Sequence, residues 1–321
     1  MRDAFVSTMC HLARENPRIM LLTGDLGFGV LDKFAARFPR QYLNVGVAEQ
    51  NLTGLATGLA FEGRVVFTYS IANFPTLRCL EQIRNDACYH EVDVKIVSIG
   101  AGFSYGALGV SHHATEDISI LRALPNITVV SPCDLWEVAE AARALVERPG
   151  PALLRLDKSS ARPTVQPGEQ FELGRARTIW DGFDMTLVAT GSILEEAFQA
   201  AEILGAEGIS CRVLSMHTVK PLDVESLECA AKQTGGIITV EEHTVEGGLG
   251  GAVAENLLER GVYPRCFLRV GLRAGFSSIV GSQSYLRKVY GIDANSIAEA
   301  VRVRIARVAA NDEPMEALMQ R

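Results

Sequence analysis

Short apolar runs alternate with longer helical stretches along most of this 321-residue chain, and this alternation constrains the fold more than any other feature. In the first half of the chain such runs stand at residues 19–22, 65–68, 94–99, 127–130 and 152–156. They are long enough for buried strands and too short for buried helices. Strands that alternate with helices form mostly parallel sheets covered on both faces. The sequence therefore predicts an α/β fold with doubly wound sheets.

The same alternation predicts two domains of ordinary size. The first covers residues 1–158. Residues 159–184 lose the periodicity and contain several Pro and Gly residues, so they are predicted to form a linker with room for one hairpin. Strand and helix patterns resume at residue 185, which predicts a second α/β domain over residues 185–321.

Composition and charge exclude several classes of protein. The hydrophobic content of 48% and charged content of 21% are typical of a folded globular chain. The net charge of −7, without any basic cluster, argues against nucleic-acid binding. No apolar run reaches the ~20 residues that a membrane-spanning helix needs, and no signal peptide is expected. Seven scattered cysteines without a C-x-x-C pair indicate reduced thiols and a cytoplasmic protein.

One acid stands at a strand-to-helix junction. Residues 42–45 form a short apolar strand, and a helix rich in small residues follows from Glu49. Ligands in α/β folds bind beyond the carboxyl ends of the strands, where Glu49 is predicted to lie. A first-turn Glu also complements the helix dipole, and spacing alone favours that structural role.

The residues 44–51, Asn-Val-Gly-Val-Ala-Glu-Gln-Asn, resemble the glutamate motif of the pyrimidine-binding domain of transketolase-like thiamine diphosphate enzymes. In that family the matching glutamate contacts N1′ of the cofactor's aminopyrimidine ring. A buried carboxyl can share a proton with such a weakly basic nitrogen, because desolvation disfavours its charged form. The resemblance implies that Glu49 is a catalytic and cofactor-binding residue.

Three further residues match cofactor-contacting positions of the family. Asp25 lies in a glycine-rich turn, residues 23–29, which lacks a phosphate-loop signature. The family has an aspartate in this loop, lining the cofactor cleft. Phe74 matches an aromatic residue that stacks on the pyrimidine, although a Phe at such a junction is ordinarily a core residue. Ile71 stands where transketolases often carry a second aromatic residue.

A glycine-rich loop, residues 100–109, precedes two histidines. Transketolases have Asp-Gly-Pro-Thr-His here, and this chain has Leu108-Gly-Val-Ser-His112. The resemblance implies that His112 contacts the donor carbonyl or its C1 hydroxyl, and His113 is a second candidate for substrate binding. Adjacent histidines on a helix point to different sides, so no metal site is expected from them. Leu108 stands where the family pattern has an aspartate. This chain is therefore not expected to recognise sugar hydroxyls in the way that is usual for transketolases.

The sugar-phosphate pocket of transketolases uses an Arg, a Ser, a His and a second Arg. The matching positions here are Arg2, Gly29, Gly100 and Lys158, so only the first is kept. Lys158 keeps the charge without the bidentate geometry of a guanidinium. The sequence therefore predicts a substrate other than an ordinary terminal sugar phosphate.

The family binds Mg²⁺ and the diphosphate through a Gly-Asp-Gly motif on a separate domain, and this chain contains no such motif. Residues 240–243 and 247–251 resemble the C-terminal domain of the same family. The resemblance thus implies the β-type subunit of a split transketolase, whose N-terminal-half subunit holds thiamine diphosphate and Mg²⁺. The small residues Gly54, Ala56, Thr57 and Gly58 suit close helix contact at a subunit interface, and two-fold pairing with a second copy of this chain is expected from the family.

The implied reaction transfers a two-carbon ketol unit from a ketose to an aldehyde. Two alternatives remain open. The β subunit of a 2-oxo acid dehydrogenase E1 component shares both domains and the glutamate, but the match at His112 favours a transketolase. A non-catalytic scaffold subunit would also keep the fold, and the intact motif at Glu49 argues against it.

Overall fold

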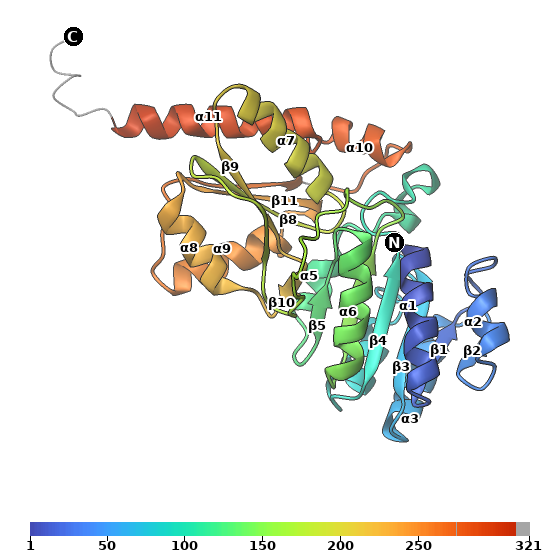
Figure 1. Cartoon of the computed structure of the whole chain (residues 1–321). Helices are drawn as coiled ribbons and strands as arrows, with labels where there is room; N and C mark the ends of the chain where they lie inside the picture. The colour runs from blue at the N-terminus through green and yellow to red at the C-terminus, as the bar shows by residue number, and fades with distance from the viewer. Residues whose placement is uncertain (274, 313–321) are drawn as a thin grey trace, which may run out of the picture.

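The structure, a computed structural model, describes residues 1–273 and 275–312 (Figure 1). It contains a seven-stranded and a five-stranded β-sheet, and helices cover both faces of each. Most neighbouring strands are parallel, as the alternation of strands and helices predicted. The α/β fold class is therefore confirmed. The predicted end of the second domain, residues 313–321, lies outside the described residues.

The first sheet has the strand order β10-β5-β6-β4-β3-β1-β2. Its strands are β1 (Ile19–Thr23), β2 (Tyr42–Asn44), β3 (Val65–Ile71), β4 (Val94–Ile99), β5 (Thr128–Val130), β6 (Ala152–Leu156) and β10 (Thr218–Lys220). The strands inside the sheet are buried along almost their whole length, which explains their continuous apolar sequences. β2 is an edge strand, with Leu43 exposed.

Helices α1 (Arg2–Glu15) and α6 (Leu135–Glu147) pack on one face of this sheet. Its other face is covered by α3 (Glu49–Phe61), the short α4 (Leu80–Gln82) with its π-helical continuation (Ile83–Cys88), and α5 (Asp117–Arg122). Helix α2 (Asp32–Arg37) and two 3-10 turns (Gly106–Leu108 and Val110–His112) lie in the connections.

The second sheet has the order β12-β11-β8-β9-β7. Its strands are β7 (Arg177–Trp180), β8 (Met185–Thr190), β9 (Cys211–Ser215), β11 (Ile237–Thr244) and β12 (Phe267–Leu272). Helices α7 (Leu194–Ala206) and α11 (Ala294–Asp312) cover one face, and α8 (Val224–Gln233) and α9 (Leu249–Glu259) the other. Helix α10 (Gln283–Val289) leads into α11. None of these helices, nor any other described one, has the length and apolar character needed to cross a membrane.

Two short strands depart from the predicted boundaries. β7 lies inside the predicted linker, and it pairs antiparallel with β9 instead of forming a local hairpin. β10 follows the second sheet's β9 in sequence, yet it pairs antiparallel with β5 of the first sheet. The two regions also share one apolar cluster, in which Val129 of the first sheet and Leu227 of α8 are both buried. The N-terminal region (residues 1–158) and the C-terminal region (residues 177–312) are thus joined by a sheet and by a core.

Candidate functional site

The predicted site residues gather at one edge of the first sheet. Asp25 follows β1, Glu49 follows β2, Phe74 follows β3, His112 follows β4 and Lys158 follows β6. Because these strands are parallel, their carboxyl ends meet at the same edge, and loops from different parts of the chain converge there.

Glu49 is the first residue of α3, and its side chain points into the protein with 2% exposed. Its Oε2 lies 2.6 Å from Nη1 of Arg78, and Ser70 Oγ donates to its Oε1 at 3.5 Å. The carboxylate is therefore bound by groups from β3 and from the turn after it, not by N–H groups of its own helix. Arg78 was not predicted from the sequence, because nothing in its local spacing marks it as a partner of Glu49.

Phe74 lies beside this ion pair. The Cζ atom of Arg78 lies 4.6 Å from the centre of the Phe74 ring, and the His112 ring approaches Phe74 edge-on at 5.2 Å. Arg78 thus presents a planar, N–H-bearing cation that lies over an aromatic ring and donates to the buried carboxylate. A protonated aminopyrimidine ring has the same planarity, charge and kind of donor. Glu49 and Phe74 therefore already bind a planar cation that carries N–H donors.

Asp25 and Ile71 complete the cofactor positions predicted from the sequence. Asp25 has a positive φ of 59°, and it is fixed by Asn44, whose side chain accepts from its backbone N–H at 3.0 Å and donates to its Oδ1 at 2.9 Å. Gly24, beside it, lies so close to Glu49 that an added Cβ would be 3.5 Å from the Glu49 Cγ. Ile71 ends β3, and its carbonyl accepts from the Phe74 N–H at 3.0 Å.

His112 is half-buried between Phe74 and Tyr105, whose ring centre lies 6.1 Å away. Ser111 Oγ lies 3.0 Å from its Nδ1. Burial, with a smaller contribution from the neighbouring His113, lowers the pKa of His112 below its ordinary value. Its imidazole is therefore neutral near pH 7 and can donate one hydrogen bond to a ligand oxygen.

His113 occupies a different environment. Only 3% of it is exposed, its ring packs edge-on against Phe103 at 5.0 Å, and its Nε2 lies 3.1 Å from the Gly106 carbonyl oxygen. Because a carbonyl only accepts, Nε2 carries the proton here. Asn73 fixes the same segment by donating to the His113 carbonyl at 2.9 Å. These contacts favour a role in holding the loop that presents His112.

Arg2 and Lys158, which are distant in sequence, line one cavity of about 250 Å³ together with Met1, Asp3, Ala4 and Leu135. Arg2 bonds only weakly to Asp3, at 3.4 Å. The Lys158 ammonium lies 4.7 Å from the centre of the Tyr105 ring, and Tyr105 also contacts His112. Two cations therefore lie on the side of the site next to His112.

The described part of the chain contains no cluster of three or more His, Cys, Asp or Glu side chains that could hold a metal ion. The described residues of this edge include the buried acid Glu49, the rings of Phe74, Tyr105 and His112, and the cations Arg2, Arg78 and Lys158. Such a set can bind a protonated heterocycle and an anionic ligand, but it lacks the oxygen ligands that Mg²⁺ prefers.

Comparison with known proteins defines the class of this arrangement. Residues 1–164 match the family described as "Transketolase, pyrimidine binding domain", and residues 174–297 match "Transketolase, C-terminal domain". The chain therefore belongs to the transketolase family. That membership implies dependence on thiamine diphosphate.

Its relatives specify the type of chain. It is 38% identical to a subunit of the apulose-4-phosphate transketolase of Phocaeicola vulgatus, over 93% of this chain and 95% of that protein. It is 36% identical to a 6-deoxy-6-sulfo-D-fructose transketolase subunit of Clostridium sp. (strain MSTE9), over 94% and 92%. A solved structure, "Split gene transketolase, inactive beta4 tetramer", superposes with a TM-score of 0.85 at 38% identity, covering 95% of this chain and 97% of that one. This chain is the β-type subunit of a split transketolase, as the resemblance predicted.

Proposed function

We propose that this chain, paired with a diphosphate-binding subunit, transfers a two-carbon ketol unit from a non-standard ketose to an aldehyde. The observation that supports it best is the arrangement of Glu49, Phe74 and His112 around one point of the sheet edge. Thiamine diphosphate supplies, when bound, the carbon nucleophile that accepts the ketol unit. The residues of this chain bind, orient and exchange protons around it.

Each residue has a defined task in this proposal. Glu49 would hold a proton at its carboxyl oxygen for exchange with the pyrimidine nitrogen, and its burial would keep water away from that oxygen. Phe74 offers its ring face to the pyrimidine in place of Arg78. Asp25 and Ile71 line the same cleft. His112, neutral near pH 7, donates to the donor carbonyl or C1 hydroxyl.

The partner subunit is proposed to supply Mg²⁺ and to bind the diphosphate. Exposed apolar side chains stand in the segments that flank Glu49: Phe28 in the loop after β1 and Val47 just before α3 are each 76% exposed, and Leu55 on α3 is 40% exposed. Their position beside the site suits a partner that closes it.

A second copy of this chain is the other proposed partner. Gly54 and Gly58 are exposed on α3, and a side chain at either position would meet no atom of this chain within 4 Å. Ala56 and Thr57, predicted from the sequence to face an interface, are buried within the chain instead. The interface proposal therefore rests on the two glycines alone. We also propose a cytoplasmic location, because all seven cysteines are free thiols.

The cavity with Arg2 and Lys158 suits a donor sugar with an anionic group at the end remote from its ketone. The two relatives are named for apulose 4-phosphate and for 6-deoxy-6-sulfo-D-fructose, and both names denote sugars with an anionic group. We propose that the donor here is likewise an anionic, non-standard ketose. The absence of an acid at Leu108 agrees with altered recognition of sugar hydroxyls.

Titration calorimetry of thiamine diphosphate with Mg²⁺ tests the proposal, first with this chain alone and then with its copurified partner. Binding only in the pair supports the shared site, and tight binding by the lone chain contradicts it. A donor screen follows, in which a higher kcat/KM for xylulose 5-phosphate than for apulose 4-phosphate and 6-deoxy-6-sulfo-D-fructose would refute the donor class. Copurification of a lipoyl-bearing acyltransferase would instead favour the dehydrogenase alternative.

A further inference from the structure

The C-terminal region packs against the loop that carries His112 and forms a hydrogen bond with it. Phe103 lies in this loop, residues 100–113, and its backbone N–H donates to Oε1 of Glu242, in β11, at 2.5 Å. The ring of Tyr290 stacks on the Phe103 ring with centres 5.4 Å apart, and the edge of His113 is the other ring contact of Phe103. Phe103 is thus fixed by its main chain and by its side chain to elements that follow it by more than 130 residues.

The glycines of the loop show how closely the two regions fit. Gly102 has a φ of +55°, and a Cβ there would lie 2.6 Å from the Cγ of Glu242. A Cβ on Gly106 would lie 2.6 Å from the Gly281 carbonyl oxygen and from the Leu286 Cδ1. No larger residue fits either position without displacing the C-terminal region.

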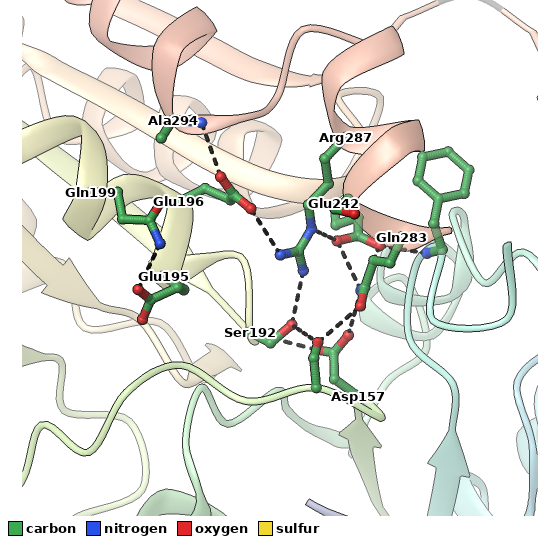
Figure 2. A network of polar contacts seen from close by, with 12 residues as sticks. Asp157, Ser192, Glu195, Glu196, Gln199, Glu242, Gln283, Arg287 and Ala294 are labelled. Atoms are coloured by element: carbon green, nitrogen blue, oxygen red, sulfur yellow. Dashed lines mark hydrogen bonds and ion pairs between the residues drawn. The ribbon is translucent and has the colours of Figure 1, made fainter. Parts of the chain in front are cut away.

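Glu242 is itself held by a buried polar network (Figure 2). Nε of Arg287 donates to its Oε2 at 2.5 Å, and Nε2 of Gln283 donates to its Oε1 at 3.0 Å. Glu242 and Arg287 are 3% and 6% exposed. The second guanidinium arm of Arg287 donates to Ser192 Oγ at 3.0 Å.

Gln283 extends this network to the residue that precedes Lys158. Its Nε2 also donates to Oδ1 of Asp157 at 3.2 Å, and Asp157 accepts from the Oγ of Ser104, a residue of the His112 loop, at 2.9 Å. The backbone N–H of Lys158 donates to the same Ser104 hydroxyl at 3.3 Å. One side chain therefore connects Glu242, the His112 loop and the start of the Lys158 segment.

The geometry points to Glu242, Gln283 and Arg287 as positioning residues for the substrate side of the site. They touch neither the proposed cofactor contacts nor the substrate cavity, and they act through Phe103 and Asp157 on His112 and Lys158. A buried ionic network adds little to the stability of a domain interface, because desolvation of the charges offsets their attraction. Apolar packing would give equal or greater stability. Their directional bonds fix loop positions that apolar contacts would leave less defined.

This inference rests on the proposed function, and the experiment separates the two. Gln283→Met keeps the length of the side chain and removes its hydrogen bonds, and the half-buried position of Gln283 makes misfolding less of a risk than at Glu242. Arg302→Met is the matched control, because it breaks an exposed pair with Glu207 in the same region and outside the network. Both variants are assayed in the reconstituted pair with wild-type protein alongside.

The inference predicts that Gln283→Met raises the KM for the donor about 5–20-fold, as expected for lost positioning at the reacting centre. The calorimetric Kd for thiamine diphosphate stays within about twofold of wild type, and Arg302→Met changes neither constant. Glu242→Gln, which keeps an acceptor for Phe103 but removes the charge that holds Arg287, shifts KM in the same direction. An unchanged donor KM in both network variants, or a parallel loss of cofactor affinity, overturns the inference.

If the reconstituted wild-type pair showed no ketol transfer, the proposed function would be refuted. The positioning role would then be tested by a second measurement. Hydrogen–deuterium exchange of the wild-type and Gln283→Met pairs then decides it. Faster exchange confined to residues 100–113 and 157–159 supports the positioning role. Unchanged exchange there, or faster exchange throughout the C-terminal region, contradicts it.

Discussion

Replacing Glu49 with Gln separates the chemistry of the site from its stability. Glutamine has nearly the same shape, so it still fills the buried position and can accept from Arg78 and Ser70. It cannot hold a shared proton at the carboxyl position. The variant therefore removes one chemical property while leaving the packing of α3 in place.

The expected losses differ greatly in size. Glu49 is buried, but Arg78 is 45% exposed, so solvent screens the pair and its contribution to stability is about 0.2–1 kcal/mol. Such a loss lowers Tm by no more than roughly 2–4 °C for a domain of 150–250 residues. Loss of a proton-transfer group costs about 10²–10⁴-fold in rate. That fold-change corresponds to roughly 3–5 kcal/mol of activation free energy.

The assay measures kcat of the reconstituted pair at saturating thiamine diphosphate and Mg²⁺, with thermal unfolding of the same samples. Glu49→Asp is the control, because it keeps the ionisable group and shortens its reach. We expect Glu49→Gln to lose at least a hundredfold in kcat with little change in Tm, and Glu49→Asp to keep more activity. A Glu49→Gln pair with kcat within threefold of wild type would refute the catalytic role and favour a scaffold subunit.

Three further predictions test other parts of the molecule. Phe74→Leu weakens thiamine diphosphate binding about 3–10-fold by calorimetry, because a ring stack contributes about 0.5–1.5 kcal/mol beyond its buried area; an unchanged Kd would remove Phe74 from the cofactor site. Lys158→Met raises KM for an anionic donor more than for its uncharged analogue, and equal effects on both would argue against the charge contact. Burial lowers the pKa of His243 from 6.5 to about 4. Between these two pH values the unfolded chain binds a proton at this residue and the folded chain does not. The free energy of unfolding therefore falls as the pH falls through this window, by up to ~3 kcal/mol. In urea unfolding measured from pH 7 to pH 4, His243→Gln is expected to lose less stability than wild type. The same dependence of unfolding free energy on pH in both proteins would contradict this prediction.

The sequence predicted what local pattern determines. Apolar runs of five or six residues became buried strands, and Glu49 was expected at the strand-to-helix junction where it stands. The convergence of Asp25, Phe74 and Lys158 at one edge followed from the parallel order of the strands. The three-residue strand β10 was missed, because a segment so short carries no period and its pairing with β5 depends on a distant chain segment.

Contacts between distant residues were the other omission. Arg78 stands 29 residues after Glu49, and Glu242 follows Phe103 by 139 residues. In each case the local sequence does not mark the charged side chain as a partner of the distant residue. The contact forms only when folding brings the two segments together. Residues 240–243 were noted for their resemblance to a C-terminal domain, but the contact that connects them to the site required the structure.

The pairs Glu49–Arg78 and Glu242–Arg287 fix different parts of the site, one the proposed cofactor contacts and the other the loop that carries His112. Glu49 and Arg78 both belong to the N-terminal region, so the proposed cofactor contacts are fixed within the first sheet and its loops. Glu242 and Arg287 both belong to the C-terminal region, and they reach the site through Phe103 and, by way of Gln283, through Asp157. Changes in the C-terminal region should therefore alter how the donor is held before they alter cofactor binding.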